Sequence, residues 1–220
     1  MRQLIKNLYM GIIRFLNLIY IKKKVQSKHI VIMMTFAEDV CPIVEALYRK
    51  GYAITVIGNE ENRKYLQQFE TINFLPAGNK RVFKHIKALS SAKVIVIDTY
   101  YLMLGGLKKK PNQTIIQTWH AAGALKQFGL TDHQVDLSNA KMVNQYRKVY
   151  NATDKYLVGG EPMIECFKAS FEASDDQFLR TGLPRLVPYT RLDVVKRQNE
   201  LKKQYGIEGK VAIYVPTYRE

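Results

Sequence analysis

The 220-residue sequence contains only two cysteines and few acidic residues. Cys41 and Cys166 lie far apart and form no CxxC pair, which is typical of reduced core residues in a cytosolic protein and offers no metal site. The 19 aspartates and glutamates are outnumbered by 34 lysines and arginines, so the formal net charge is +15. This excess predicts an anionic partner, which could be a membrane surface, a phosphorylated substrate or nucleic acid.

Several nucleotide-related motifs are absent as well. No P-loop occurs, no GxGxxG follows the first strand-like segment, and no nucleophile triad is recognisable. The basic residues do not interleave with aromatic residues as they do in nucleic-acid-binding modules. We therefore expect no bound cofactor and no nucleic-acid partner, which leaves an anionic membrane and a phosphate-bearing substrate.

The first 24 residues lack both acidic side chains and an uninterrupted apolar run. Arg14 and Asn17 divide the segment, which disfavours a membrane-spanning helix, and no cleavage site of a signal peptide is clear. Apolar residues instead recur at helical spacing, which predicts an amphipathic helix in the membrane interface. The alternatives are a first helix that packs on the protein itself and a spanning anchor.

The expected bilayer contacts are apolar on one side of this helix and basic around it. The apolar stripe consists of Leu4, Leu8, Ile12, Phe15 and Ile19. The basic side chains expected to reach lipid phosphates are those of Lys6, Arg14, Lys22, Lys23 and Lys24.

From residue 28 onward, short apolar runs alternate with helical segments. Strands are expected at 29–34, 53–58, 72–76, 93–101, 114–119, 155–160 and 177–182. Helices are expected at 39–51, 60–69, 82–92, 133–150, 161–171 and 193–207. Continuous β-branched strands separated by helices are typical of a parallel sheet covered on both faces, so we predict a doubly wound, Rossmann-like α/β fold.

The last residues, KVAIYVPTYRE (210–220), begin another apolar strand where the sequence stops. A strand at an open end needs partners, so we expect the amino-terminal part of a longer protein. The predicted organisation is a membrane-interfacial helix (1–24), a Rossmann-like acceptor domain (25–190), and a linker helix with the first strand of a truncated donor domain (191–220).

Polar side chains follow several expected strands, at the edge where parallel sheets bind ligands. Asp98 follows the fourth strand, and Trp119 and His120 follow the fifth. An imidazole accepts a proton near neutral pH, so His120 suits a general base. The small residues 121–123 are expected to open a helix whose amino terminus favours phosphate, with Lys126 one turn further on. The alternative is a histidine that only hydrogen-bonds within a tight turn.

Three motifs, in the same order, resemble those of one family. QTWHAAGALKQFG (117–129) resembles the Trp-His-(Gly/Ala) signature of the CDP-glycerol glycerophosphotransferases of wall teichoic acid synthesis, and most resembles their primase branch. TGLPRL (181–186) resembles the family's Gly-x-Pro-Arg segment, although the aspartate that usually follows comes later here. YVPTYRE (214–220) resembles a Tyr-x-Pro-Thr-aromatic-Arg strand.

The resemblance implies the first half of a GT-B architecture, which holds a lipid-linked acceptor, while a second domain holds CDP-glycerol. His120 would deprotonate an acceptor hydroxyl, which attacks the β-phosphorus of CDP-glycerol and expels CMP. The acceptor implied is an undecaprenyl-diphosphate-linked disaccharide. The enzyme would then be peripheral on the cytoplasmic face of the membrane, in association with other teichoic acid enzymes. This chain alone is expected to be inactive.

From the residues and the resemblance together, we expect one set of substrate contacts around this base. The set comprises Trp119, Gly123, Lys126, Asp98, Arg185, Thr217 and Arg219. Two other functions fit the same fold: a GT-B glycosyltransferase that acts on a lipid-linked acceptor, and a non-catalytic lipid-binding module. The donor bound by the full-length protein distinguishes the first, and the activity of His120→Ala distinguishes the second.

Overall fold

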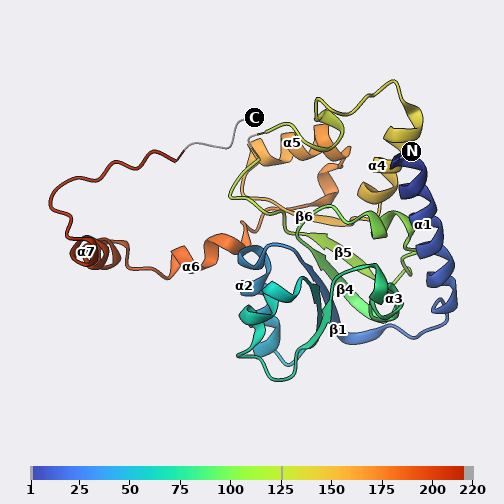
Figure 1. Ribbon diagram of the computed structural model, residues 1–220, viewed down its shortest axis with the longest axis horizontal. Coiled ribbons are helices and arrows are strands. Elements are labelled where there is room, and N and C mark those ends of the chain that lie inside the picture. The colour runs from blue at the N-terminus through green and yellow to red at the C-terminus, as the bar shows by residue number, and fades with distance from the viewer. Residues whose placement is uncertain (1, 125, 216–220) are drawn as a thin grey trace. The chain divides into compact units, whose positions relative to one another are not determined.

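The computed structural model describes residues 2–124 and 126–215, and the chain divides into two units, Met1–Leu186 and Val187–Glu220. The first unit is built on a seven-stranded parallel sheet in the order β3-β2-β1-β4-β5-β6-β7 (Figure 1). The strands are β1 (Gln26–Met34), β2 (Ala53–Gly58), β3 (Asn73–Pro76), β4 (Ala92–Ile97), β5 (Thr114–Gln117), β6 (Lys155–Leu157) and β7 (Phe178–Leu179). The predicted doubly wound α/β fold is confirmed.

Helices cover both faces of this sheet. The α-helices of the first unit are α1 (Arg2–Ile19), α2 (Ala37–Arg49), α3 (Val82–Leu89), α4 (Ala140–Tyr150) and α5 (Glu161–Phe171). Short 3-10 helices are η1 (Glu60–Leu66), η2 (Asn79–Arg81), η3 (Leu102–Gly106), η4 (Gly129–Thr131), η5 (Asp175–Gln177) and η6 (Pro184–Leu186). In Figure 1, α1 and α3 lie on one side of the sheet and α2 on the other.

The carboxyl-terminal halves of the central strands β1 and β4 are buried on both faces, because helices cover each side of the sheet. Val31 and Met33 belong to a core cluster that includes residues of α1 and α3. Ile30 and Ile32 point to the other face and pack with residues of α2. This two-sided burial explains why the strands read as continuous apolar runs rather than as alternating ones.

Two expected helices differ in the structure. The segment 60–69 forms the 3-10 helix η1, which ends at Leu66. The helix expected at 133–150 begins only at Ala140, because Asp132 and Asp136 accept hydrogen bonds from the backbone N–H groups of Gln134 and Ser138. Such local side-chain bonds favour turns over helix.

One side of helix α1 belongs to the protein core. Met10, Ile13 and Leu16 are buried, and the Asn17 amide accepts a hydrogen bond of 3.0 Å from the backbone N–H of Lys108. Gly106 in η3 allows this close approach, since a Cβ atom there would overlap the Met10 carbonyl oxygen. The alternative that the helix packs on the protein itself therefore holds for this side.

The opposite side of α1 is exposed and apolar. The five residues of the predicted stripe are 48–73% exposed: Leu4, Leu8, Ile12, Phe15 and Ile19. Within the part of the chain that the structure describes, no helix combines the length and apolar character needed to cross a membrane. Contact of this stripe with a bilayer stays a prediction.

The second unit contains α6 (Val187–Thr190) and α7 (Val194–Tyr205). Asp193 caps α7, because its carboxylate accepts a hydrogen bond from the backbone N–H of Lys196. The strand expected from residue 210 is absent over 210–215, where the described chain has no partner strand to pair with. Thr217 and Arg219, both expected to contact substrate, lie outside the described residues.

Candidate functional site

The candidate site lies at the carboxyl edge of the sheet, where the strand order reverses between β1 and β4. Such switch points are where open α/β sheets bind ligands. Thr35 and Phe36 follow β1, Asp98 follows β4, and His120 lies three residues beyond β5. The structure thus brings Asp98 and His120, which the sequence placed at this edge, together with Thr35 and Phe36.

Asp98 holds the ends of two neighbouring strands together. Its carboxylate accepts hydrogen bonds from the backbone N–H groups of Thr35 (2.6 Å) and Phe36 (2.7 Å), and from the Tyr101 hydroxyl (2.7 Å). Burial raises the pKa of Asp98, although these three hydrogen bonds favour its ionised form. The residue is 0% exposed and its hydrogen bonds order the backbone beside His120, while contact of Asp98 with a substrate stays a prediction.

The backbone of Asp98 orients the imidazole of His120. Its Nδ1 atom lies 3.0 Å from the carbonyl oxygen of Asp98. A carbonyl oxygen can only accept, so Nδ1 carries the hydrogen and Nε2 of the neutral ring keeps its lone pair. The Phe36 ring stacks on the imidazole at 4.7 Å, and the Trp119 ring packs against it at 4.3 Å. The half-buried imidazole is therefore held in one orientation, with the tautomer that a base at Nε2 requires.

Trp119 adopts a left-handed backbone conformation, with φ at 68°. For a bulky residue this costs on the order of 1–3 kcal/mol, so the surrounding contacts must impose it. Its N–H donates to the Gln117 side chain (3.2 Å), its indole N–H donates to the Gly123 carbonyl (3.3 Å), and its ring packs on Phe128 and Phe167. The turn aims the next residue, His120, at Asp98.

The helix expected directly after His120 is not present. Residues 118–124 are irregular, and the next regular element is η4. The left-handed Trp119 and its indole bond to Gly123 shape the segment as a turn, which removes the expected phosphate-binding helix terminus. Lys126 is exposed in the loop rather than one helical turn beyond the histidine. A Cβ atom on Gly123 would meet no atom within 4 Å, so the space above this backbone is open.

Arg185 lies in the 3-10 helix η6, which follows β7, and pairs with α2. Its guanidinium donates to both carboxylate oxygens of Asp39 at 2.7 and 2.6 Å, and Asp39 is buried. Gly182, with φ at 78°, makes the preceding turn. This ion pair fixes the Gly-x-Pro-Arg segment to the first turn of α2. Contact of Arg185 with a substrate stays a prediction.

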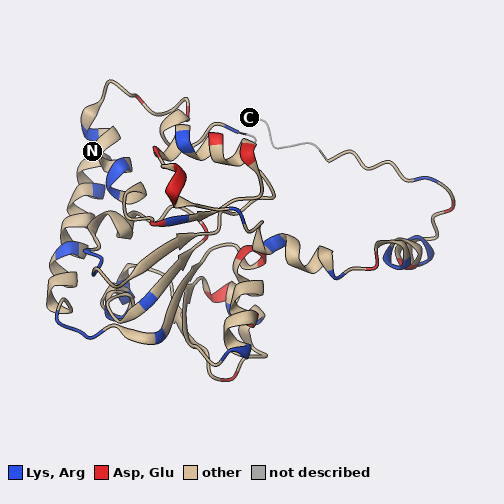
Figure 2. Ribbon diagram, turned by 180° about the vertical axis from the view of Figure 1, so that it is seen from behind, with Lys and Arg blue, Asp and Glu red and all other residues tan. Residues whose placement is uncertain are grey.

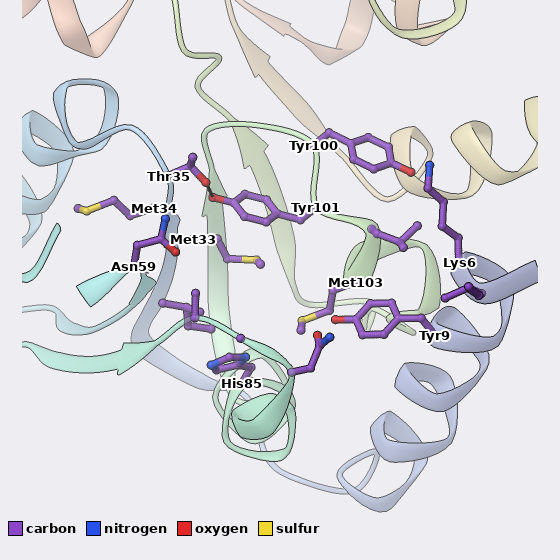
Figure 3. Close-up of a pocket in the computed structure, with 17 residues that line it drawn as sticks. Lys6, Tyr9, Met33, Met34, Thr35, Asn59, His85, Tyr100, Tyr101 and Met103 are labelled. Atoms are coloured by element: carbon purple, nitrogen blue, oxygen red, sulfur yellow. Dashed lines mark hydrogen bonds between the residues drawn. The ribbon is translucent and has the colours of Figure 1, made fainter. Parts of the chain in front are cut away.

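Two cavities border the site. A cavity of about 180 Å³ lies beside Trp119 and His120 and is lined mainly by aromatic side chains. A larger one, of about 480 Å³, lies between α1 and the ends of β1 and β2 (Figure 3). Over residues 2–124 and 126–215, no group of three or more His, Cys, Asp or Glu side chains could hold a metal ion.

Sequence reasoning missed how several neighbours act in the site. Tyr101 joins Asp98 to Thr35, Phe36 stacks on His120, and Asp39 pairs with Arg185. The pattern offered one signal for these roles, since Phe36 and Tyr101 stand in the segments that follow β1 and β4. The sequence offered no such signal for Asp39, because acidic residues are common in the first turn of a helix, where they interact favourably with the helix dipole.

Comparison with known proteins identifies the family. The chain is 49% identical over 221 residues to the teichoic acid glycerol-phosphate primase of Staphylococcus aureus (strain NCTC 8325 / PS 47), a match that covers 100% of this chain and 60% of that protein. It is 29% identical to the primase of the same name from Bacillus subtilis (strain 168), covering 100% and 58%. The chain thus spans a little over half the length of these relatives.

The fold has solved counterparts. A variant of the wall teichoic acid polymerase TagF, soaked with CDPG, matches with a TM-score of 0.69 and 19% identity, over 100% of this chain and 57% of that one. This likeness supports the predicted first half of a GT-B architecture. The family model described as CDP-Glycerol:Poly(glycerophosphate) glycerophosphotransferase matches residues 19–220. The chain therefore belongs to the CDP-glycerol:poly(glycerophosphate) glycerophosphotransferase family.

Proposed function

We propose that the protein transfers glycerol phosphate from CDP-glycerol to the lipid-linked disaccharide, and that the first unit holds the acceptor. One observation carries this proposal. His120 bonds the Asp98 carbonyl through Nδ1, which leaves Nε2 as a base at the ligand-binding edge of the sheet. The family membership supplies the donor and the reaction class.

The transfer needs one proton acceptor on this side. His120 Nε2 takes the proton of an acceptor hydroxyl as its oxygen bonds to the β-phosphorus of CDP-glycerol. The bond between this phosphorus and the bridging oxygen breaks, and CMP leaves with the electron pair. Phe36 and Trp119 hold the imidazole while it becomes charged. Such a step depends mainly on positioning and on stabilisation of charge.

We propose addition of a single unit rather than a polymer. The three glycerol-phosphate primases among the relatives align with 88–100% of this chain. The polymerases among them align with 52–60% of it. The full-length similarity thus follows the primase branch that the motif after His120 resembles.

The decisive assay follows labelled CDP-glycerol with a short-chain disaccharide-diphosphate acceptor and the complete protein. We expect one unit added, and a loss of about 10²–10⁴-fold in His120→Gln, the range for removal of a general base. His133→Gln is the matched control, because the His133 side chain is 82% exposed beside Asp132. Transfer from a UDP-sugar but not from CDP-glycerol would instead indicate a glycosyltransferase, and full activity of His120→Gln would exclude this base.

We also propose that the protein works on the cytoplasmic face of the membrane, with the exposed side of α1 in the interface. No acidic residue precedes Glu38, and Figure 2 shows basic but no acidic residues on α1. Arg14, Lys22 and Lys24 are exposed and available to lipid phosphates. Lys23 instead donates a hydrogen bond to the Lys87 carbonyl oxygen at 3.0 Å.

A further inference from the structure

The larger cavity extends from α1 to two residues that hold the Asp98 carboxylate. It begins at Ile5 and Lys6 on α1 and reaches Thr35 and Tyr101, which both bond to Asp98. Its volume of about 480 Å³ lies within the range typical of small-molecule sites, roughly 300–1,000 Å³. Apart from Lys6, which was assigned to the membrane, none of the predicted ligand-binding side chains within residues 2–124 and 126–215 lines it. The sequence analysis therefore predicted no ligand for this cavity.

One end of the cavity carries hydrogen-bond donors that suit an anion. Tyr100 and Lys6 both line it (Figure 3). The Tyr100 ring centroid lies 5.8 Å from that of Tyr146, and the Lys6 Nζ atom lies 5.9 Å from the same Tyr146 centroid. The Tyr100 hydroxyl is buried and has no hydrogen-bond partner among the described residues. Burial raises the pKa of Tyr100 to about 12, so its hydroxyl stays a donor at neutral pH. A buried donor without a partner costs free energy unless a ligand accepts its hydrogen.

The rest of the lining suits a sugar next to that anion. Tyr9 and Tyr101 offer aromatic rings, and Asn59 and Asn79 offer amides that can bond to hydroxyl groups (Figure 3). The other end of the cavity abuts the Asp98 cluster that orients His120. In a lipid-linked disaccharide, the reacting hydroxyl lies on the far side of the sugar from the diphosphate. With its diphosphate at the first end of the cavity, such an acceptor would extend toward His120.

The end of the cavity at α1 opens to the exterior and could let a lipid chain leave. Ile5 lines the cavity and is 60% exposed, and its neighbours Leu4 and Leu8 are 73% and 65% exposed. The cavity mouth is therefore continuous with the apolar side of α1. Four features follow one another in the structure: the apolar side of α1, the donors Lys6 and Tyr100, a space of sugar size, and the base His120. A lipid-linked saccharide has its lipid chain, diphosphate, sugar and reacting hydroxyl in the same order.

We propose that this cavity binds the diphosphate and the adjoining sugar of the lipid-linked acceptor. Lys6 and Tyr100 bind the diphosphate, and the lipid chain leaves over Ile5. This assignment rests on the proposed function, because that function supplies the acceptor. Lys6, expected from the sequence to contact the bilayer, is thereby a substrate-binding residue.

The test measures binding of a short-chain disaccharide-diphosphate lipid to the complete protein, without donor and without vesicles. The variants are Lys6→Gln and Tyr100→Phe, and Lys141→Gln is the control, since Lys141 is exposed on α4 and does not line the cavity. Loss of one bond to a charged group is expected to weaken binding about tenfold in each variant. Tyr100→Phe removes a hydroxyl without a partner, so its melting temperature should not fall.

The outcomes separate this proposal from the proposed function. If the wild type transfers glycerol phosphate while both variants bind the acceptor within twofold of it, the cavity assignment is wrong and the function stands. If the wild type neither binds the acceptor nor transfers, both are wrong. If Lys6→Gln weakens binding to phosphatidylglycerol vesicles but leaves acceptor binding unchanged, Lys6 is a bilayer contact and the cavity assignment is also overturned.

Discussion

The guanidinium of Arg185 meets the carboxylate of Asp39 in two hydrogen bonds of 2.7 and 2.6 Å, across 146 positions of sequence. Arg185 follows the last strand of the sheet, and Asp39 lies in the first turn of α2, directly after the strand β1. The pair therefore joins η6, the last helix of the first unit, to the segment that carries Phe36. The Gly-x-Pro-Arg segment can thus act on the site by fixing the chain around it.

Removing one partner of this pair should destabilise the fold. Asp39→Ala leaves the Arg185 charge partly buried without its carboxylate, which we expect to cost about 3 kcal/mol, as for other buried pairs. Urea unfolding of this variant measures the loss. Glu38→Ala is the matched control, because Glu38 is the exposed neighbour in the same helical turn. Equal midpoints for the two variants would contradict a structural role for the pair.

Asp98 should make stability depend on pH in a defined direction. Burial raises the pKa of Asp98 in the fold above its ordinary value of 3.8, so the folded state binds its proton more tightly than the unfolded state. The stability that this proton contributes is present below the ordinary value and is lost as the pH rises through the raised one. Asp98→Asn lacks this proton, so the wild type should lose free energy of unfolding relative to Asp98→Asn across that window. An increase instead would mean that the three hydrogen bonds outweigh burial.

Gly123 separates a ligand effect from a folding effect. A Cβ atom there would meet no protein atom within 4 Å, so Gly123→Ala should leave the melting temperature unchanged. If an acceptor approaches this backbone, the added methyl group should raise the KM for acceptor several-fold and leave the KM for CDP-glycerol unchanged. Gly129→Ala offers the contrast, because its Cβ would meet the Ser170 carbonyl oxygen at 2.6 Å and should destabilise the fold. Unchanged kinetics in Gly123→Ala would remove Gly123 from the substrate contacts.

Vesicle binding should depend on the exposed side of α1. Leu8 and Phe15 are 65% and 67% exposed, so the double variant Leu8→Gln, Phe15→Gln should fold normally and lose most binding to anionic vesicles. Raised salt should weaken binding of the wild type, because it screens the basic residues. Deletion of residues 1–24 is a poor test, since it would also expose the core around Ile13 and Leu16. Undiminished binding by the double variant would rule out this surface.

The sequence predicted the sheet well because burial on both faces leaves a strong local signal. Ala53–Gly58 and Glu161–Phe171 lie where the apolar pattern placed a strand and a helix. The turn after β5 could not be predicted, because the left-handed Trp119 is imposed by partners that include Phe167, 48 positions away. For the same reason the sequence indicated His120 as a base but not its tautomer, which depends on the Asp98 carbonyl.

Helix α1 was interpreted from one of its sides only. The stripe of Leu4, Leu8 and Ile12 marked the exposed side, while Met10 and Ile13, which pack inside, are equally apolar in the sequence. Nothing in the local sequence pattern distinguishes apolar residues that pack in the protein core from apolar residues that stay exposed on the helix surface. Only the packing against η3 makes the distinction.

Because α1 is fastened along its inner side, it turns with the sheet as a rigid body. A flexible tether would let an enzyme sample many heights and tilts above a bilayer. A helix that is held against the core at Gly106 and Asn17 permits only one height and one tilt. If the outer side of α1 rests in the interface as proposed, the fold sets the distance from the lipid headgroups to His120, and with it the length of acceptor that can reach the proposed base.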